Sequence, residues 1–136
     1  MKAPLKGVFN GVFDTVDNIK ISPFSRAYTF SDSVYEVVPF FNSTAIAFDD
    51  HIKRLEFSAS QLAMAVDLKE VTFEINSLIT SSEFSNGYVY YQVTRGVDPL
   101  RSHIHEANLK VETFGYAKAH LFQWKPLRVS VCDDIR

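Results

Sequence analysis

The chain has 136 residues, of which 46% are hydrophobic and 14% aromatic, so it is long and apolar enough for one folded domain, and a disordered chain is excluded. Its formal net charge of -2, without a basic cluster, argues against a nucleic-acid partner. No segment has the length of a signal peptide's apolar core or of a membrane span, so we expect a cytoplasmic protein with no membrane partner.

Two β-hairpins are predicted near the start of the chain. Asn10-Gly11 is the dipeptide that most readily takes the positive φ angles of a two-residue turn, and apolar pairs at 8–9 and 12–13 flank it. Residues 34–41 are dense in β-branched and aromatic side chains, residues 42–44 are typical of a turn, and residues 45–48 form a shorter apolar run. Each pattern indicates two strands joined by a tight turn.

Two helices are predicted after the hairpins, because the spacing of apolar residues changes to three and four. Asp49 or Asp50 is the expected N-cap of the first helix. The second helix fades near residues 81–82 and stops at Asn86-Gly87. The expected buried positions are Ile52, Leu55, Ala59, Leu62 and Val66 in the first helix, and Val71, Ile75, Leu78 and Ile79 in the second.

Strand patterns return in residues 88–94 and 109–116. Strands grouped around two central helices predict an α+β domain with a mainly antiparallel sheet, which we place at residues 1–118. Residues 119–126 fit neither period and are expected to be an interdomain linker. Residues 127–132 start a further strand, in which Cys132 is expected to be a small buried hydrophobe. A strand without neighbours suggests that residues 127–136 begin a truncated second domain.

Three polar groups are candidates for chemistry, and each also has an ordinary structural interpretation. Tyr35 lies in a predicted strand, where tyrosines usually serve packing. Arg54 lies in the first turns of a predicted helix, either as a solvated charge or as an anion ligand whose planar fork matches a phosphate. Arg101 and His103 share a loop, either as ordinary polar residues or as a pair that converges on a carboxylate. No distant ligands complete a coordination shell near this loop, so no metal is expected.

Taken in their order along the chain, five segments resemble the first domain of the class IV aminotransferases, and most closely the D-amino acid transaminases. The order and the approximate spacing of these short segments match the family, and the resemblance covers nearly the whole chain. The segments are RAYTF at 26–30, DSVYEVV at 32–38, HIKRL at 51–55 with Ser-Ala at 58–59, YQVTRG at 91–96 with Arg101-x-His103, and DDIR at 133–136.

The resemblance implies an enzyme that uses pyridoxal phosphate, as an electron sink, to move an amino group between a D-amino acid and a 2-oxo acid. Arg54 matches the family's phosphate-binding arginine. Tyr35, Arg101 and His103 match the group that holds the substrate carboxylate. In the family the arginine and the histidine of this group come from the partner subunit of a homodimer.

The sequence departs from the family at three points. Ser33 stands where the family usually has glycine, and Leu100 adds a residue before the Arg-x-His loop. The lysine that carries the cofactor in this family lies just beyond a segment like residues 133–136, and none of the chain's eight lysines matches it. We therefore expect the parent protein to be an enzyme and this chain, which lacks a catalytic residue, to be inactive alone.

Other functions remain open. A branched-chain aminotransferase or an aminodeoxychorismate lyase would share the cofactor and the fold, although the Arg-x-His loop favours D-amino acids over branched-chain substrates. A stand-alone, noncatalytic binding domain belongs to a second class. A binder of single-stranded nucleic acid could stack bases on Tyr88, Tyr90 and Tyr91, but the chain offers no basic groove for the backbone.

Overall fold

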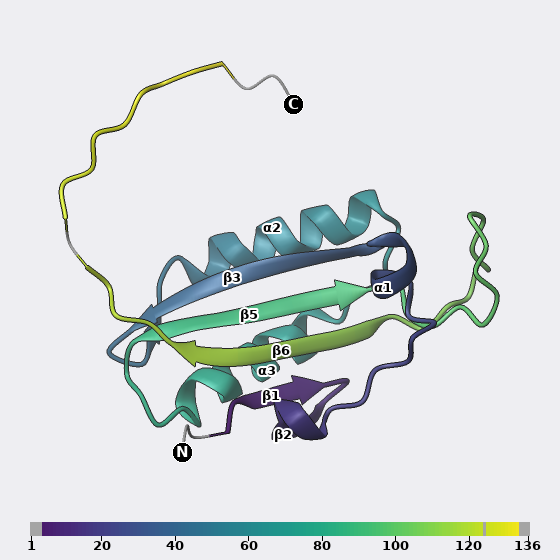
Figure 1. Ribbon diagram of the computed structural model, residues 1–136, viewed down its shortest axis with the longest axis horizontal. Helices are drawn as coiled ribbons and strands as arrows, with labels where there is room; N and C mark the ends of the chain where they lie inside the picture. Colours follow the sequence, from purple (N-terminus) through teal and green to yellow (C-terminus); the bar gives the residue numbers. More distant parts are fainter. Residues whose placement is uncertain (1–3, 124, 134–136) are drawn as a thin grey trace.

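The computed structural model describes residues 4–123 and 125–133 and is built around a six-stranded sheet (Figure 1). The strand order is β2-β1-β6-β5-β3-β4, and each neighbouring pair is antiparallel. The strands are β1 (Lys6–Phe9), β2 (Val12–Thr15), β3 (Ser33–Phe41), β4 (Thr44–Ala45), β5 (Gly87–Thr94) and β6 (Glu112–Ala119). The predicted α+β class with a mainly antiparallel sheet is confirmed.

Both predicted hairpins are present, and their turns have the expected backbone. Asn10 and Gly11 have φ angles of 48° and 82°, and Asn42 and Ser43 have φ angles of 48° and 58°. Positive φ at both central residues gives a turn whose twist matches that of the flanking strands. The second strand of the second hairpin is shorter than the predicted 45–48, because Ala47 takes a left-handed conformation and a helix begins directly after it.

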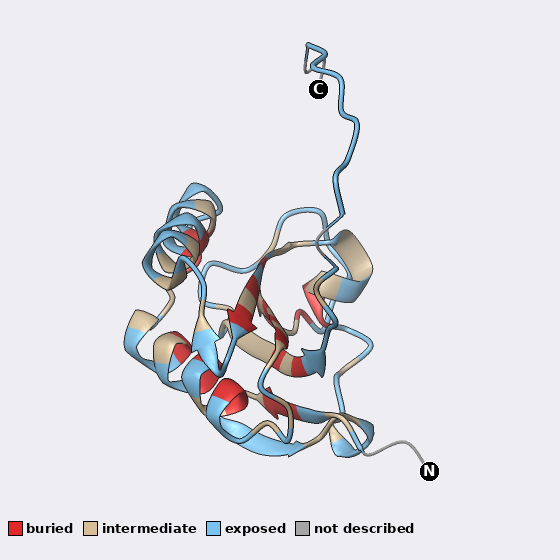
Figure 2. Cartoon of the chain, turned by 90° about the vertical axis from the view of Figure 1, so that its left-hand side faces the viewer, coloured by how far each residue is buried: buried red, intermediate tan, exposed pale blue. Residues whose placement is uncertain are grey.

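Two long helices, α2 (Phe48–Gln61) and α3 (Leu68–Thr80), cover one face of the sheet (Figures 1 and 2). The predicted N-cap of α2 is wrong, since Asp49 and Asp50 lie in its first turn, where carboxylates favour the positive end of the helix dipole. The helix also ends before Leu62, so the predicted face extending to Val66 is too long. Asp67 caps α3 by accepting hydrogen bonds from two backbone N–H groups of its first turn.

The core lies between these helices and the sheet (Figure 2). Alternate residues of a strand point to opposite faces, so each central strand sends every second side chain toward the helices. The buried members are Val8, Val38, Phe40, Val89, Tyr91, Val93 and Ala117 from the sheet, Leu55, Ala59, Val71, Ile75, Leu78 and Ile79 from the helices, and Met64 from the segment between the helices. Burying such a side chain contributes about 1.5–3 kcal/mol, so this one face supplies most of the stability of the domain.

Two short elements, η1 (Val16–Asn18) and α1 (Arg26–Phe30), were not predicted, because neither is long enough to show a period. The last strand, β6, lies three residues later than the predicted 109–116 and reaches Ala119. Among the described residues, no helix has the length and apolar character needed to cross a membrane.

Residues 125–133 form no strand, although one was predicted from residue 127 (Figure 1). The segment leaves the sheet after β6, and among the described residues it pairs with no strand, so no ladder of backbone hydrogen bonds holds it in place. Cys132 is exposed, so its predicted burial is wrong. Residues 134–136, which belong to the DDIR segment, lie outside the described residues.

Candidate active-site face

The face of the sheet opposite the helices carries a row of aromatic rings from three neighbouring strands. The Tyr35 ring on β3 stacks on the Tyr90 ring on β5, with centroids 5.5 Å apart, and Tyr90 stacks on Tyr116 of β6 at 5.4 Å. Tyr35 is 62% exposed. Its hydroxyl group is therefore available to a ligand on this face, which the helices do not cover.

A hollow of about 460 Å³ lies between Gln92 and the segment that leads into α1. Gln92 is the direct cross-strand partner of Tyr35, and its side-chain amide donates a hydrogen bond of 2.8 Å to the hydroxyl of Ser33. Ser33, where the family pattern has glycine, thus fits the end of the strand and supplies an acceptor. The hollow is lined by Ile21, Ser22, Pro23, Ser25, Ala27, Tyr28 and Gln92.

Arg54 forms a two-point ion pair with Glu36 on the helix side of β3. Its Nε lies 2.5 Å from Oε1 of Glu36 and its Nη2 lies 2.6 Å from Oε2, while His51 Nδ1 lies 2.7 Å from the same Oε2. Burial opposes the charge of Glu36, but the hydrogen bonds from Arg54 and His51 outweigh it and lower the pKa of this carboxyl group. The Arg54 side chain is 65% exposed, so Glu36 fixes the guanidinium without covering it.

Tyr35 and Arg54 therefore flank β3 from opposite sides. Glu36 follows Tyr35 in the strand and points toward α2, whereas Tyr35 points toward the open face. The structure links Arg54 to the strand through Glu36 and gives no direct contact between Arg54 and Tyr35.

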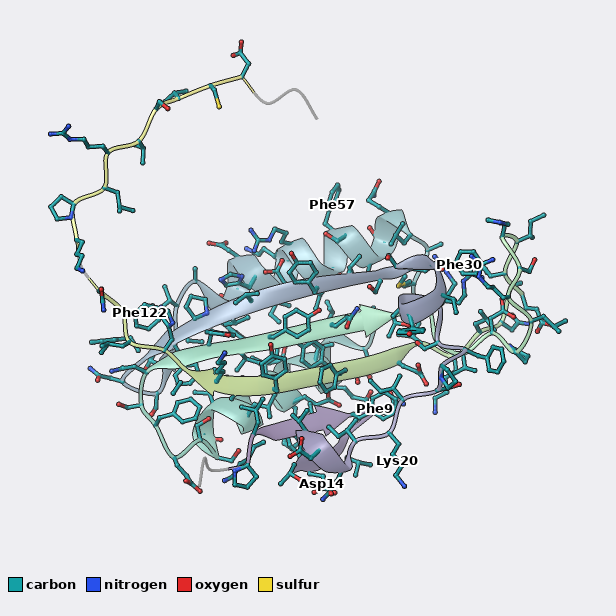
Figure 3. All side chains as sticks on the ribbon, in the orientation of Figure 1. Phe9, Asp14, Lys20, Phe30, Phe57 and Phe122 are labelled. Atoms are coloured by element: carbon teal, nitrogen blue, oxygen red, sulfur yellow. The ribbon has the colours of Figure 1, made fainter. Side chains whose placement is uncertain are left out.

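The structure brings Arg101 and His103 together on one aromatic ring. The guanidinium carbon of Arg101 lies 4.7 Å from the centroid of the Phe30 ring, and the His103 ring packs edge-on against Phe30 at 5.3 Å. Both side chains are exposed, so both can reach a ligand. Phe30 ends α1, at the end of the sheet from which the loop between β5 and β6 extends (Figures 1 and 3). Leu100, the added residue, is 72% exposed in this loop.

A largely buried cluster of charges lies at the base of this loop, and sequence reasoning did not predict it. Arg26 and Arg95 both donate to Oδ2 of Asp32, at 2.9 and 2.7 Å, and Arg26 also reaches Asp98 at 3.2 Å. Burial opposes ionisation of Asp32, but the two arginines prevail and lower its pKa. The only signal in the sequence was that Arg26, Asp32 and Arg95 fall within the segments that resemble the family.

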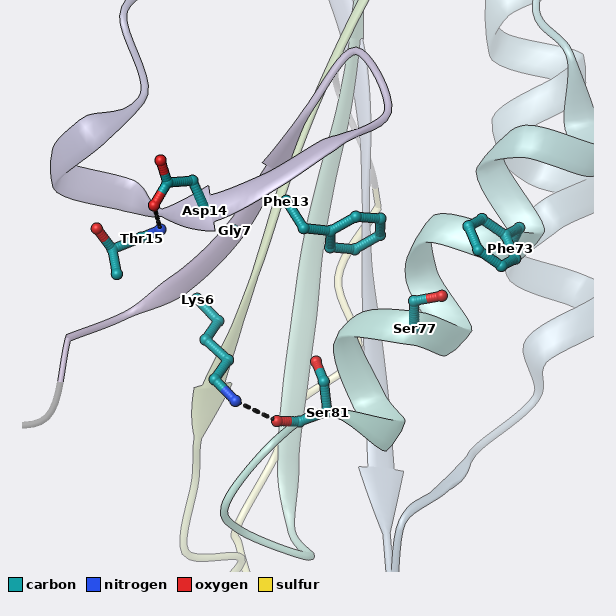
Figure 4. Close-up of a pocket in the computed structure, with 8 residues that line it drawn as sticks. All are labelled: Lys6, Gly7, Phe13, Asp14, Thr15, Phe73, Ser77 and Ser81. Atoms are coloured by element: carbon teal, nitrogen blue, oxygen red, sulfur yellow. Dashed lines mark hydrogen bonds between the residues drawn. The ribbon is translucent and has the colours of Figure 1, made fainter.

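A second hollow, of about 510 Å³, lies between the first hairpin and α3 (Figure 4). Phe13 and Phe73 pack edge-on there with centroids 6.4 Å apart, and Lys6 donates a hydrogen bond of 2.7 Å to the Ser81 carbonyl. None of the predicted site residues lines it. Within the described ranges, no group of three His, Cys, Asp or Glu residues could hold a metal ion.

These features define a small α+β domain with one open aromatic sheet face and an exposed arginine–histidine pair at its end. Residues 33–134 match the family "Amino-transferase class IV", and the chain belongs to this family. The D-alanine aminotransferase of Bacillus licheniformis is 30% identical over 138 residues, which cover 97% of this chain and 48% of that protein. The chain thus spans about half the length of this relative.

Solved structures share the fold at low sequence identity. The branched-chain amino acid aminotransferase of Escherichia coli superposes with a TM-score of 0.78 at 19% identity, over 86% of this chain and 41% of that chain. The 4-amino-4-deoxychorismate lyase of Pseudomonas aeruginosa superposes with a TM-score of 0.71 at 19% identity, over 83% of this chain and 39% of that chain. The fold of this domain is therefore shared by enzymes with different substrates.

Proposed function

We propose that this chain is the small domain of an aminotransferase that moves an amino group between a D-amino acid and a 2-oxo acid. The observation that carries the proposal is the pairing of Arg101 and His103 on Phe30, which presents two exposed donors at one place. A guanidinium and an imidazole so placed suit a carboxylate, which both substrate classes contain. The relative named D-alanine aminotransferase supports the choice of D-amino acids.

The proposed cofactor is pyridoxal phosphate, which would supply the electron sink for the reaction. Arg54 fits the phosphate of this group. Glu36 binds its Nε and Nη2 and fixes the plane of the guanidinium, while most of the side chain stays exposed. Such an orientation lowers the conformational entropy that an arginine loses when it binds a phosphate.

Tyr35 would complete the carboxylate site, but among the described residues of this chain it has no contact with Arg101 or His103. We propose that the protein is a homodimer in which the loop of one subunit supplies Arg101 and His103 to the Tyr35 of the other. The extension of the loop beyond the end of the sheet supports this arrangement (Figure 1). The residue that carries the cofactor would lie in a second domain after a linker that follows β6, one residue later than the predicted start at 119, and the share of the relative that the chain covers supports this.

The test uses the full-length protein with 2-oxoglutarate as the acceptor and compares two donors, with pyruvate measured as the product of D-alanine and 4-methyl-2-oxopentanoate as the product of L-leucine. We expect turnover with D-alanine well above that with L-leucine. Turnover with L-leucine alone would identify a branched-chain enzyme. Release of pyruvate from aminodeoxychorismate would identify a lyase, and the absence of all three activities would favour a noncatalytic domain.

The carboxylate role is tested by Arg101→Ala. Loss of a charged hydrogen bond costs about 1.5–3 kcal/mol, so kcat/KM for D-alanine should fall about tenfold or more, mainly through KM, with the cofactor absorbance intact. Lys69→Ala removes an exposed positive charge on α3, away from this loop, and serves as the control. Unchanged kinetics in Arg101→Ala would make this residue an ordinary loop residue.

A further inference from the structure

The side chain of Arg26 connects α1 to the loop that carries Arg101 and His103. Its Nη1 donates a hydrogen bond of 2.8 Å to the carbonyl of Ser102, the residue between these two. The same Nη1 lies 3.2 Å from Oδ2 of Asp98. One guanidinium thus holds the loop at its base and at the peptide that joins the arginine to the histidine.

The backbone around Arg26 supports this connection. The N–H of Arg26 donates to the carbonyl of Gly96 at 2.8 Å, and the N–H of Asp98 donates to the carbonyl of Phe24 at 3.1 Å. Ser25 and Val97 form an isolated antiparallel bridge between these two bonds. The segment that enters α1 therefore pairs with the first residues of the loop.

The aromatic ring on which the loop residues pack belongs to the same short helix. Phe30 ends α1, and the guanidinium carbon of Arg26 lies 4.4 Å from the centroid of its ring. Arg101 and His103 pack against that ring at 4.7 and 5.3 Å. Arg26 therefore fixes the Ser102 backbone and contacts the ring on which the two exposed side chains lie.

We propose that Arg26 is a positioning residue for the carboxylate-binding pair, an inference that rests on the proposed function. Arg26 does not bind the substrate itself, since only 5% of its side chain is exposed and its Nε and Nη1 donors are used by Asp32, Asp98 and Ser102. It affects substrate binding by fixing the loop that carries Arg101 and His103. The fork of donors makes this possible, because one planar group satisfies three acceptors in fixed directions, which a lysine ammonium does with far less directional precision.

The cluster contains its own matched control. Arg95 binds the same Asp32 oxygen as Arg26, but its Nη2 donates to the carbonyl of Leu62 and not to the loop. Arg26→Lys and Arg95→Lys therefore weaken the same ion-pair cluster and keep its charge. Only Arg26→Lys weakens the hydrogen bond to the carbonyl of Ser102.

The kinetic experiment compares these variants in the full-length protein. In Arg26→Lys we expect KM for D-alanine to rise about tenfold, with kcat changed much less and the cofactor absorbance retained. In Arg95→Lys, KM should stay within about twofold of the original. In the Arg101→Ala background, Arg26→Lys should raise KM by clearly less than in the original protein, because one of the two side chains through which it acts is gone. An equal rise in both backgrounds would overturn the proposal.

A second variant and a second measurement cover the case in which Arg26→Lys does not fold. Asp98→Asn keeps an acceptor oxygen but removes the charge that Arg26 contacts near the loop, and should raise KM about threefold. Amide hydrogen exchange in residues 98–105 should be faster in Arg26→Lys, or in Asp98→Asn if the first is unfolded, than in Arg95→Lys. Equal exchange in all variants would overturn the positioning role.

The two proposals fail in different ways. If the original protein does not convert D-alanine, the proposed function is wrong, and the exchange rates still decide whether Arg26 orders the loop. If it converts D-alanine but Arg26→Lys keeps the original KM and exchange rates, the function stands and the positioning role is wrong.

Discussion

The hydroxyl of Tyr91 donates a hydrogen bond of 2.5 Å to the buried carboxyl group of Glu74 and so joins the centre of the sheet to α3. Both residues are buried, and Thr113 of β6 lies 3.4 Å from the same carboxyl oxygen. Tyr91→Phe should lower the free energy of unfolding by about 1–3 kcal/mol, because the carboxyl group stays buried without its main donor. Urea unfolding of the chain at neutral pH measures this loss.

Tyr90→Phe is the matched control for this variant. Tyr90 precedes Tyr91 in the same strand, but its ring lies in the aromatic row on the open face. Removing its hydroxyl should change the free energy of unfolding by less than about 0.5 kcal/mol. A similar loss in both variants would mean that the Tyr91–Glu74 bond contributes no more than the hydroxyl of Tyr90.

The carboxyl group of Glu74 should also make stability depend on pH. Burial raises its pKa above the ordinary 4.5, and the hydrogen bond from Tyr91 reverses only part of that rise. As pH rises above 4.5, the unfolded chain releases this proton before the folded domain does. The contribution of Glu74 is therefore fully present below that pH and is lost as pH rises through the folded pKa.

Glu74→Gln removes the proton and keeps an acceptor for Tyr91. The difference in unfolding free energy between the original chain and this variant should shift in favour of the variant as pH rises from about 4 to about 8. Asp32 and Glu36 have lowered pKa values, so they make both proteins more stable as pH rises. Their contribution cancels when the unfolding free energies of the two proteins are subtracted. A difference that is constant with pH would contradict a raised pKa for Glu74.

The sheet could be predicted because its signals are local. Asn10-Gly11 and the turn at 42–43 specify positive φ from neighbouring residues alone, and the period of two in β3 and β5 follows from their burial on one face. The start of α2 was missed because Ala47, a residue that rarely takes positive φ, does so here. That conformation depends on packing around the helix and not on the residue itself.

The site was only partly predictable for the same reason. Residue type and order pointed to Tyr35, Arg54, Arg101 and His103, but no local pattern says that a ring at position 30 carries two of them. The bond between Arg26 and Asp98 joins residues far apart in the sequence, and buried arginines look like surface arginines in a sequence. Tertiary contacts of this kind require the structure.

Arg54→Ala should weaken retention of pyridoxal phosphate by the full-length protein. Loss of a charged hydrogen bond to a phosphate corresponds to about a tenfold or greater rise in Kd, seen as a loss of visible absorbance on dialysis. Lys53→Ala removes the same charge from an exposed neighbour on α2 and should retain the cofactor. Unchanged retention in Arg54→Ala would leave this arginine as the partner of Glu36 alone.

The 136-residue chain alone should not catalyse transamination. The proposed reaction would require a lysine to hold the cofactor and to move a proton. We expect none of the eight lysines of this chain to serve as that residue, so the chain alone should carry out neither step. Borohydride treatment should likewise trap no site-specific adduct with pyridoxal phosphate, although slow labelling of surface lysines is expected.

The decisive measurement is the pyruvate assay with D-alanine and 2-oxoglutarate, in which the purified chain is compared with free pyridoxal phosphate at the same concentration. We expect equal rates in the two samples. A rate clearly above that of the free cofactor, together with one labelled lysine in a peptide map after borohydride, would show that a lysine of this chain serves as the catalytic base. The domain would then hold a complete site by itself, and the assignment of the cofactor-binding lysine to a second domain would be wrong.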